Sequence, residues 1–299
     1  MSDARIVDRG YRRYDGPRLG EAAILRSLAV HSLRRVLGLR RPARFKALPV
    51  LVIAVAFFPA IIIVGIAAFV GDAAFSNGTE LPSYAGYSGF VMSAILVFVT
   101  FVAPEALCPD RRTRLLGQYL AAPVSRGGYV AAKAVSVYSV LLTVTLGPQL
   151  LLVVALTLED AGPSGVDGFF ATLGRIVASG LVLSLFFGTI ALAASSLTDR
   201  KAFASVGFLV FTLVTSAAAA ILYDDGDGVT WAGGLSITGL PVEAVFRIFA
   251  VPARCRGRGS CDTLIYPELS TVGVAIAVIA WFLLAAGVIW ARYRDVEAS

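Results

Sequence analysis

Six long apolar runs divide this chain of 299 residues, and they constrain its fold more than any other feature of the sequence. Each run has about 20 residues or more, the length at which an α-helix crosses a hydrocarbon core about 30 Å thick. Because a bilayer offers no water to backbone N–H and C=O groups, runs of this kind form helices. We expect spans at residues 48–71, 84–103, 129–158, 170–197, 203–223 and 269–291.

The composition agrees with this expectation. Apolar residues make up 57% of the chain and charged residues only 15%, and the mean hydropathy of +0.78 lies outside the usual range of soluble domains. We therefore predict an all-α membrane protein with two parts. Residues 1–47 form an N-terminal segment that contains an amphipathic helix, and residues 48–299 form a six-helix membrane domain with its longest outer loop at 224–268.

The charges between the spans predict the orientation of the chain. On one side, the segments 1–47, 104–129 and 198–202 carry net charges of +8, +2 and +1, and the tail after residue 291 is neutral. On the other side, the loops 72–83, 159–169 and 224–268 carry −2, −3 and −2. Since Lys and Arg gather on the cytoplasmic side of membrane proteins, both termini are expected in the cytoplasm. The basic excess follows from this rule, so no nucleic-acid partner is predicted.

A basic amphipathic helix is expected before the first span. Between residues 18 and 41, apolar side chains form one helical stripe, opposite a face that carries His31 and several arginines. A helix of this kind lies at the membrane surface, where its arginines meet anionic lipid headgroups. Gly38 and Pro42 are expected to end it and to turn the chain into the bilayer. Anchoring to lipid accounts for most of this pattern, and a role in coupling is an additional hypothesis.

A charged segment with a helical pattern separates the second and third spans. Its apolar side chains recur at helical spacing and share one face: Leu115, Leu116, Tyr119 and Leu120. Its polar side chains lie on the other faces: Arg111, Arg112, Arg114 and Gln118. Asp110 is expected to cap this helix, Pro123 to stop it, and Ser125 to cap the helix that follows. Such a segment has to face water and a partner.

Several kinds of chemistry are excluded. No G-x-x-x-x-G-K-[ST] motif is present, so the chain does not hold a nucleoside triphosphate by the usual loop. The single histidine, His31, belongs to the surface helix, which excludes a Ser-His-Asp triad and a histidine-based metal site. No expected span has an interior Asp or Glu, and Lys133 and Arg175 are expected to snorkel from span ends. We therefore predict no catalytic residue, metal or cofactor, and we disfavour transport driven by an ion gradient.

A few uncharged polar side chains remain inside the spans. Most residues of this kind bond to their own helix or to a neighbouring one. An apolar path with sparse polar groups nevertheless suits an amphipathic or lipophilic substrate better than a bare ion. The candidate substrate path consists of Thr143, Gln149, Thr212, Thr215 and Ser216.

The last outer loop is the longest, and a loop of this length usually has structure or a function. Residues 242–251 are amphipathic enough for a short helix. Cys255 and Cys261 are close enough in sequence to form a disulfide in an oxidising compartment, and two free thiols are the alternative. Cys108 lies on the cytoplasmic side and is expected to be a reduced thiol.

The charged segment resembles the cytoplasmic loop of ABC-2 type permeases. In that family an acidic residue ends the second span, and a short coupling helix, a Leu-rich stretch and a proline-serine-arginine start of the third span follow. The matching residues are Glu105, Asp110, Arg111, Arg112, Leu115, Leu116, the run from Leu120 through Pro123 to Arg126, Tyr129 and Lys133. The basic helix before the first span, the six spans and the enlarged last outer loop are also similar. Family members often have Gly where this chain has Thr113, and Cys108-Pro109 departs from the usual pattern.

The resemblance implies one transmembrane half of a bacterial ABC exporter in the cytoplasmic membrane, with the ATPase on a separate chain. Two ATPase subunits would bind ATP and Mg, and a second permease, identical or homologous, would complete the path. The apolar face of the coupling helix would anchor it in an ATPase groove. Glu105 would tie the loop to the elbow helix before span one by pairing with Arg34, Arg35 or Arg41. A gradient-driven secondary transporter and a non-transporting assembly or sensor subunit are the alternatives.

Overall fold

The computed structural model describes residues 16, 20–39, 42–70, 83–113, 115, 124–223, 229–251 and 264–294. Within these ranges the chain forms helices and turns, with no strand. Six helical segments in this part of the chain are long and apolar enough to cross a membrane, which confirms the expected number of spans. Their bounds are Lys46–Phe69, Tyr84–Arg112, Arg126–Leu158, Gly165–Leu197, Lys201–Leu222 and Thr271–Arg294.

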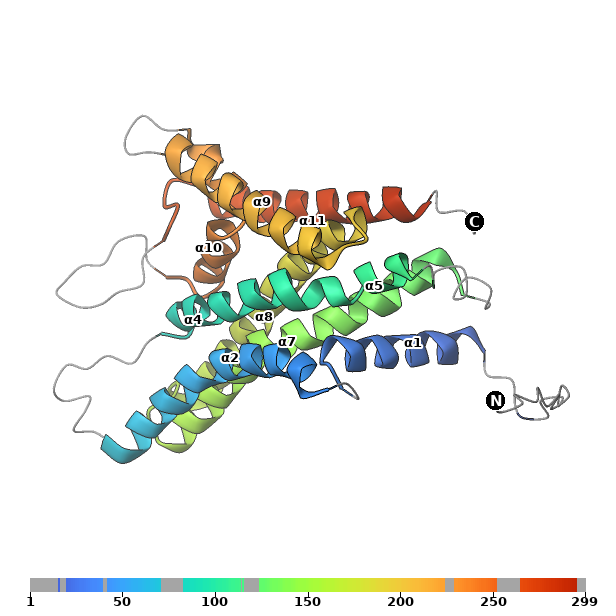
Figure 1. Ribbon diagram of the computed structural model, residues 1–299. Coiled ribbons are helices and arrows are strands. Elements are labelled where there is room, and N and C mark those ends of the chain that lie inside the picture. The colour runs from blue at the N-terminus through green and yellow to red at the C-terminus, as the bar shows by residue number, and fades with distance from the viewer. Residues whose placement is uncertain are drawn as a thin grey trace, which may run out of the picture.

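The helices form one bundle with shorter elements at its two ends (Figure 1). The long helices are α2 (Ala43–Val70), α4 (Tyr84–Val97), α7 (Arg126–Leu158), α8 (Gly165–Leu197), α9 (Lys201–Leu222) and α11 (Thr271–Arg294). The short ones are α1 (Glu21–Val36), α5 (Cys108–Arg112), η3 (Thr230–Leu235) and α10 (Gly239–Ile248). We call the end that carries α1, α5 and the α8–α9 turn the basic end, since the described Lys and Arg residues of these elements lie there.

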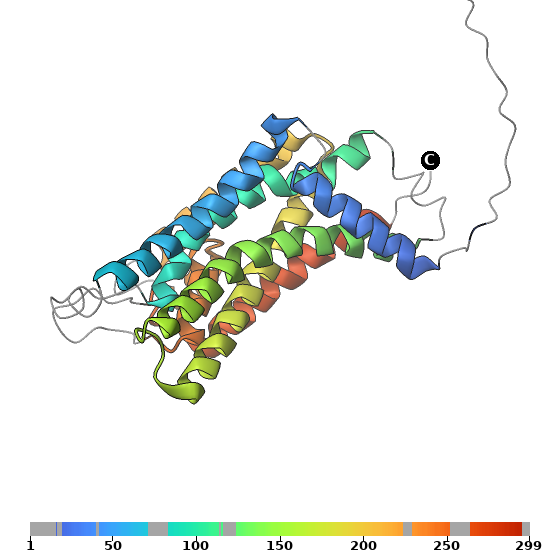
Figure 2. The ribbon, with the colours of Figure 1, turned by 90° about the horizontal axis from the view of Figure 1, so that it is seen from below.

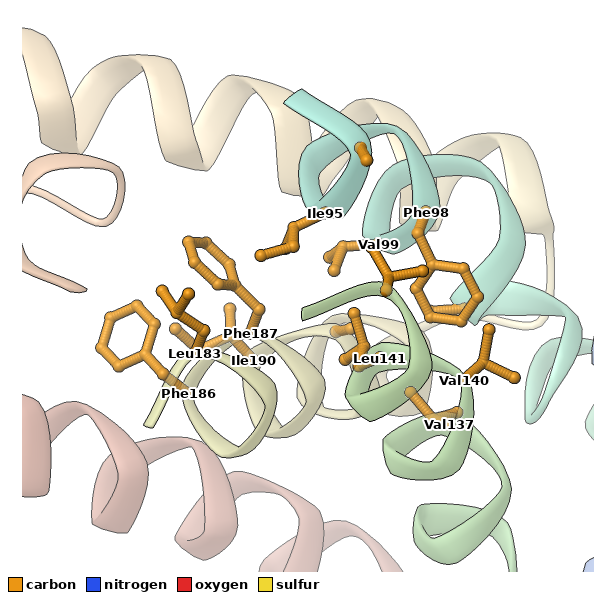
Figure 3. Packing of buried hydrophobic residues seen from close by; sticks show 14 of the residues in the cluster. Ile95, Phe98, Val99, Val137, Val140, Leu141, Leu183, Phe186, Phe187 and Ile190 are labelled. Carbon is orange, nitrogen blue, oxygen red and sulfur yellow. The ribbon is translucent and has the colours of Figure 1, made fainter. Parts of the chain in front are cut away.

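The core of the bundle forms where α7 and α8 pack on each other and on the second helical segment, Tyr84–Arg112. Figure 3 shows how the three helices interdigitate: Ile95 and Phe98 come from the second span, Val137 and Leu141 from α7, and Phe187 from α8. In a bilayer the lipid is as apolar as these side chains, so close packing rather than exclusion of water holds the helices together. Small residues at the helix contacts therefore matter, because they let the helices approach closely.

Gly188 on α8 is one such contact. A Cβ added there would lie 2.4 Å from Cε1 of Tyr138 on α7. The Tyr138 ring cannot easily move away, because its hydroxyl is hydrogen-bonded to Thr189 at 2.7 Å. Gly188 thus lets α7 and α8 approach closely.

We expect Gly188→Ala to lower the melting temperature of the purified protein, since the new methyl group overpacks a close helix contact at a cost of about 1–3 kcal/mol. Gly174→Ala on the same helix is the matched control, because a Cβ at Gly174 meets nothing within 4 Å. That change should be neutral or slightly stabilising, by up to about 1 kcal/mol. Equal melting temperatures for the two variants would contradict the close contact.

The expected helix before the first span is present as α1. Its end is set by Gly38, which adopts φ 65°, and by the bonds from Gly38 N–H to Arg35 O and from Leu39 N–H to Arg34 O. This is the glycine-terminated helix end that the sequence predicts. The helix packs along the first turns of α7, where Gly128 lies against Leu25 (Figure 2).

The second span is irregular and longer than expected. After α4, the chain makes a π-helical turn, η1 (Phe98–Val102), then a 3-10 turn, η2 (Ala103–Glu105), and then α5. The Ser205 hydroxyl of α9 donates to the Thr100 carbonyl in the π-helical turn, at 2.5 Å. The predicted end at residue 103 is therefore wrong, and the helical segment extends to Arg112. Pro104 does not stop it because proline is tolerated in the first turn of a helix.

The short helix expected in the last outer loop is present as α10. It packs against α8, α11 and α4, and its Leu240 and Val245 side chains are fully buried. Glu243 on the same helix is also buried, which was not predicted.

Candidate functional site

Asp110, on α5 at the basic end, lies at the centre of a buried ion-pair cluster. Its Oδ1 pairs with Nη1 of Arg35 on α1. Its Oδ2 lies 2.5 Å from Nζ of Lys133 on α7 and accepts a hydrogen bond from the Tyr129 hydroxyl at 3.0 Å. One carboxylate therefore joins the end of the second helical segment to the helix before the first span and to the third span.

The cluster is shielded from water. The side chains of Asp110 and Lys133 are fully buried, and that of Arg35 is only 12% exposed. Lys133 also lies over the Tyr129 ring, 5.5 Å from its centroid. The predicted snorkelling of Lys133 is thus wrong. Lys133 is two helical turns inside α7, and a partner carboxylate within reach compensates its charge better than an extended path to the surface.

Tyr129 connects this cluster to the last span. Its ring packs on that of Tyr293, near the end of α11, with the centroids 6.1 Å apart. Tyr293 is buried, and its hydroxyl has no hydrogen-bond partner among the described residues. The two packed rings therefore link Asp110 to the last turn of α11.

The opposite face of the same segment contacts the α8–α9 turn. Arg111 donates to the carbonyl of Ser196, and its Nε lies 3.1 Å from Oδ1 of Asp199. Glu105 pairs with Lys201. The residues from Glu105 to Arg111 consequently connect to four helices, so a displacement of this segment acts on all of them.

A basic recess opens beside this contact. It has a volume of about 1060 Å³ and is lined by Pro109, Arg111, Arg112, Thr113, Asp199, Arg200, Lys201 and Ala202. Four of these side chains are cationic and one is acidic, and Arg112 and Arg200 are exposed. The recess therefore favours an acidic partner surface.

The structure corrects two expectations about this segment. Asp110 does not cap a helix, since it lies inside α5, whose N-cap is Leu107. Of the three arginines expected to pair with Glu105, Arg35 binds Asp110 instead and Arg34 lies exposed on α1, while Arg41 lies outside the described residues. Ser125 does cap α7 as expected, and its Oγ accepts the Gly128 N–H at 3.0 Å.

Some expected site residues lie outside the described residues. These are Arg41 of the elbow helix, Leu116, Tyr119, Leu120 and Pro123 of the coupling segment, and Cys255 and Cys261. Their predicted roles stay predictions. Cys108 is described, and it is a buried free thiol whose Sγ lies 3.6 Å from the Ser195 carbonyl.

The residues of the candidate substrate path come from two helices, α7 and α9. Thr143 and Thr215 donate to carbonyls of their own helices, and Ser216 is hydrogen-bonded to Thr238 at 2.9 Å. Gln149 and Thr212 are buried, with Gln149 Oε1 and Thr212 Oγ1 unpartnered within the described part of the chain. This path stays a prediction.

Sequence reasoning missed the partners of the site more than the site itself. Asp110 and Arg111 were identified, but the contacts with Lys133, Asp199 and Lys201 were not. A usable signal was present for Lys133, because it lies inside the apolar run of the third span, and charges buried in a membrane protein pair with each other.

Comparison with known proteins agrees with this architecture. A family model described as "ABC-2 family transporter protein" matches residues 72–292. The match begins after α2 and includes the whole segment around Asp110. Among curated proteins, no sequence matches the chain.

Proposed function

Because the chain belongs to the ABC-2 family transporter proteins, we propose that it is the transmembrane subunit of an ATP-driven exporter for an amphipathic or lipophilic substrate. Family membership and six apolar helices indicate a multi-pass membrane subunit of a transporter. ATP and Mg would bind to two separate ATPase subunits. A second permease, identical or homologous, would complete the complex.

The observation that carries this proposal is the Asp110 cluster. Asp110 holds α1 and α7 on one side of the segment, and Arg111 and Glu105 hold the α8–α9 turn on the other. A partner that pushes on residues 108–123 would therefore move several spans together. The apolar face predicted at Leu115, Leu116, Tyr119 and Leu120 would anchor the ATPase, since buried aromatic and aliphatic side chains dominate interface energies.

The basic recess supports the same partner. Arg112, in the charged segment, and Arg200, in the turn between α8 and α9, both line the recess and are exposed. Acidic groups on an ATPase would pair with them, orient the ATPase and raise its association rate. A gradient-driven transporter has less support, because Asp110 and Lys133 neutralise each other near the end of a span instead of forming an ion site at mid-membrane.

Replacing Leu116 and Tyr119 by Asp is expected to abolish association with the ATPase, because each change would bury an unpaired charge in the contact. The test is affinity purification of the full chain from native membranes, with mass spectrometry of copurifying proteins that carry a nucleotide-binding loop. At least a tenfold loss of that protein is expected. Gln118→Asp is the control, since it adds the same charge on another predicted face. Normal association of the Leu116 and Tyr119 variants would contradict the proposal.

A further inference from the structure

A groove on the surface of the bundle runs between α7, α8 and α11 from the basic end. Its volume of about 550 Å³ is within the usual range for small-molecule sites, about 300–1,000 Å³. Most of its wall is apolar, and the main side chains are Val130, Ala134, Leu192, Phe282, Ala286 and Ile289. Arg126 and Arg294 line the same groove.

The two arginines stand next to each other at one end of the groove. Arg126 is the first residue of α7 and Arg294 the last residue of α11, and Nη1 of Arg126 donates to the Arg294 carbonyl. Both side chains are exposed. The Arg294 guanidinium also lies 5.1 Å from the ring centroid of Trp290, and Trp gathers at membrane–water interfaces. Two positive charges therefore meet at the ends of two candidate membrane spans.

The length of the groove matches one leaflet. Tyr138 on α7 and Phe282 on α11 line it, and each lies twelve residues from the arginine at the end of its own helix. Twelve helical residues correspond to about 18 Å, whereas half of a hydrocarbon core is about 15 Å thick. The groove thus extends from headgroup depth to about the middle of the membrane, and its polarity changes from cationic to apolar along this path.

We propose that this groove binds one anionic phospholipid of the adjoining leaflet, with its phosphate on Arg126 and Arg294 and one acyl chain along the apolar wall. An apolar helix of a second copy fits less well, since it would remove two exposed guanidinium groups from water. The site does not depend on the proposed ATPase partner.

The lipid would also touch the support of the ion-pair cluster. Tyr293 lines the groove, and its ring packs on Tyr129, which donates to Asp110. The headgroup end of the bound lipid would therefore lie against the same two rings, Tyr293 and Tyr129, that pack beside Asp110.

The test uses the full chain in detergent, titrated with phosphatidylglycerol or phosphatidylcholine of identical acyl chains, and native mass spectrometry to count bound lipids. We expect one phosphatidylglycerol to bind with an apparent Kd at least about tenfold lower than that of phosphatidylcholine. R126Q/R294Q should lose this preference. R292Q should keep it, because Arg292 is exposed on the same helix end but does not line the groove.

A second pair of variants tests the apolar part. Ala286→Trp fills the groove and should weaken binding of both lipids, whereas Ala280→Trp, at an exposed position of α11 outside the groove, should not. Melting temperatures measured without added lipid identify any variant that fails to fold. Because Arg126 and Arg294 are exposed, R126Q/R294Q is expected to fold. Equal binding of the two lipids by the wild type, or an unchanged preference in R126Q/R294Q, would overturn the proposal. Displacement of phosphatidylglycerol by an equal concentration of glycerol 1-phosphate, which has no acyl chain, would overturn it as well.

Discussion

The Asp110→Asn variant is expected to lose about 3–5 kcal/mol of its free energy of unfolding, the usual cost of breaking a buried ion pair by removing one partner. Asparagine keeps the shape of the side chain but removes the charge that faces Lys133 and Arg35. Lys133 is fully buried, so it cannot regain water without moving α7. A fall in the melting temperature of the detergent-purified protein measures this loss.

Two further variants distinguish the loss of the buried ion pair from the general effect of removing an acidic side chain. D110N/K133M should recover most of the lost stability, because a buried pair replaced by neutral groups costs far less than one charge left alone. Asp199→Asn should cost less than about 1 kcal/mol, since Asp199 pairs with Arg111 but is 59% exposed. If D110N melts like the wild type, or D110N/K133M melts like D110N, the cluster does not hold the segment.

If the chain works with an ATPase as proposed, the double variant also tests how ATP hydrolysis is coupled to transport. D110N/K133M would be folded but would lack the carboxylate that joins α5 to α1 and α7. In the complex with its ATPase it should still bind the partner, while substrate transport per ATP hydrolysed decreases. Unchanged transport per ATP would show that force passes through another contact.

The spans were predictable because a bilayer imposes a strong and local rule. About 20 apolar residues in sequence are sufficient to identify a membrane helix, whatever the helix packs against. The end of α1 at Gly38 and the start of α7 at Ser125 were predictable for a similar reason, since a left-handed glycine and a capping hydroxyl act on their own helix end.

The ion pairs were not predictable in the same way, because they depend on how distant helices meet. Arg35 and Asp110 are 75 positions apart in the chain, and nothing local to either residue identifies the other. Arg35 was one of three arginines expected to pair with Glu105, but it binds Asp110, because the second span continues as a helix through Pro104. The continuation turns Asp110, rather than Glu105, towards α1. The prediction that Lys133 snorkels failed for the same reason, since its partner Asp110 lies on another helix.

Glu243 forms a second buried network, at the end of the bundle away from α1. Its Oε1 accepts a hydrogen bond from Nε of Arg247 at 2.9 Å, and its Oε2 accepts the backbone N–H groups of Ile265 and Tyr266 at 2.7 and 3.1 Å. Arg247 in turn donates to the Leu269 carbonyl at 2.8 Å. The pair therefore fixes α10 to the segment that leads into α11.

Glu243→Gln is expected to release that segment. The amide of Gln has one uncharged acceptor oxygen, whereas the Glu243 carboxylate accepts from three donors with two charged oxygens. The change also leaves Arg247 without an opposite charge. We expect a loss of about 3–5 kcal/mol, seen as faster hydrogen exchange at the amides of Ile265 and Tyr266. Arg247→Gln should have a smaller effect, since the carboxylate keeps both backbone donors. Glu268→Gln makes the same chemical change at an exposed position of the same segment and should leave exchange unaltered. Protection of both amides at wild-type levels in the Glu243 variant would mean that packing of α10 alone orders this end of the bundle.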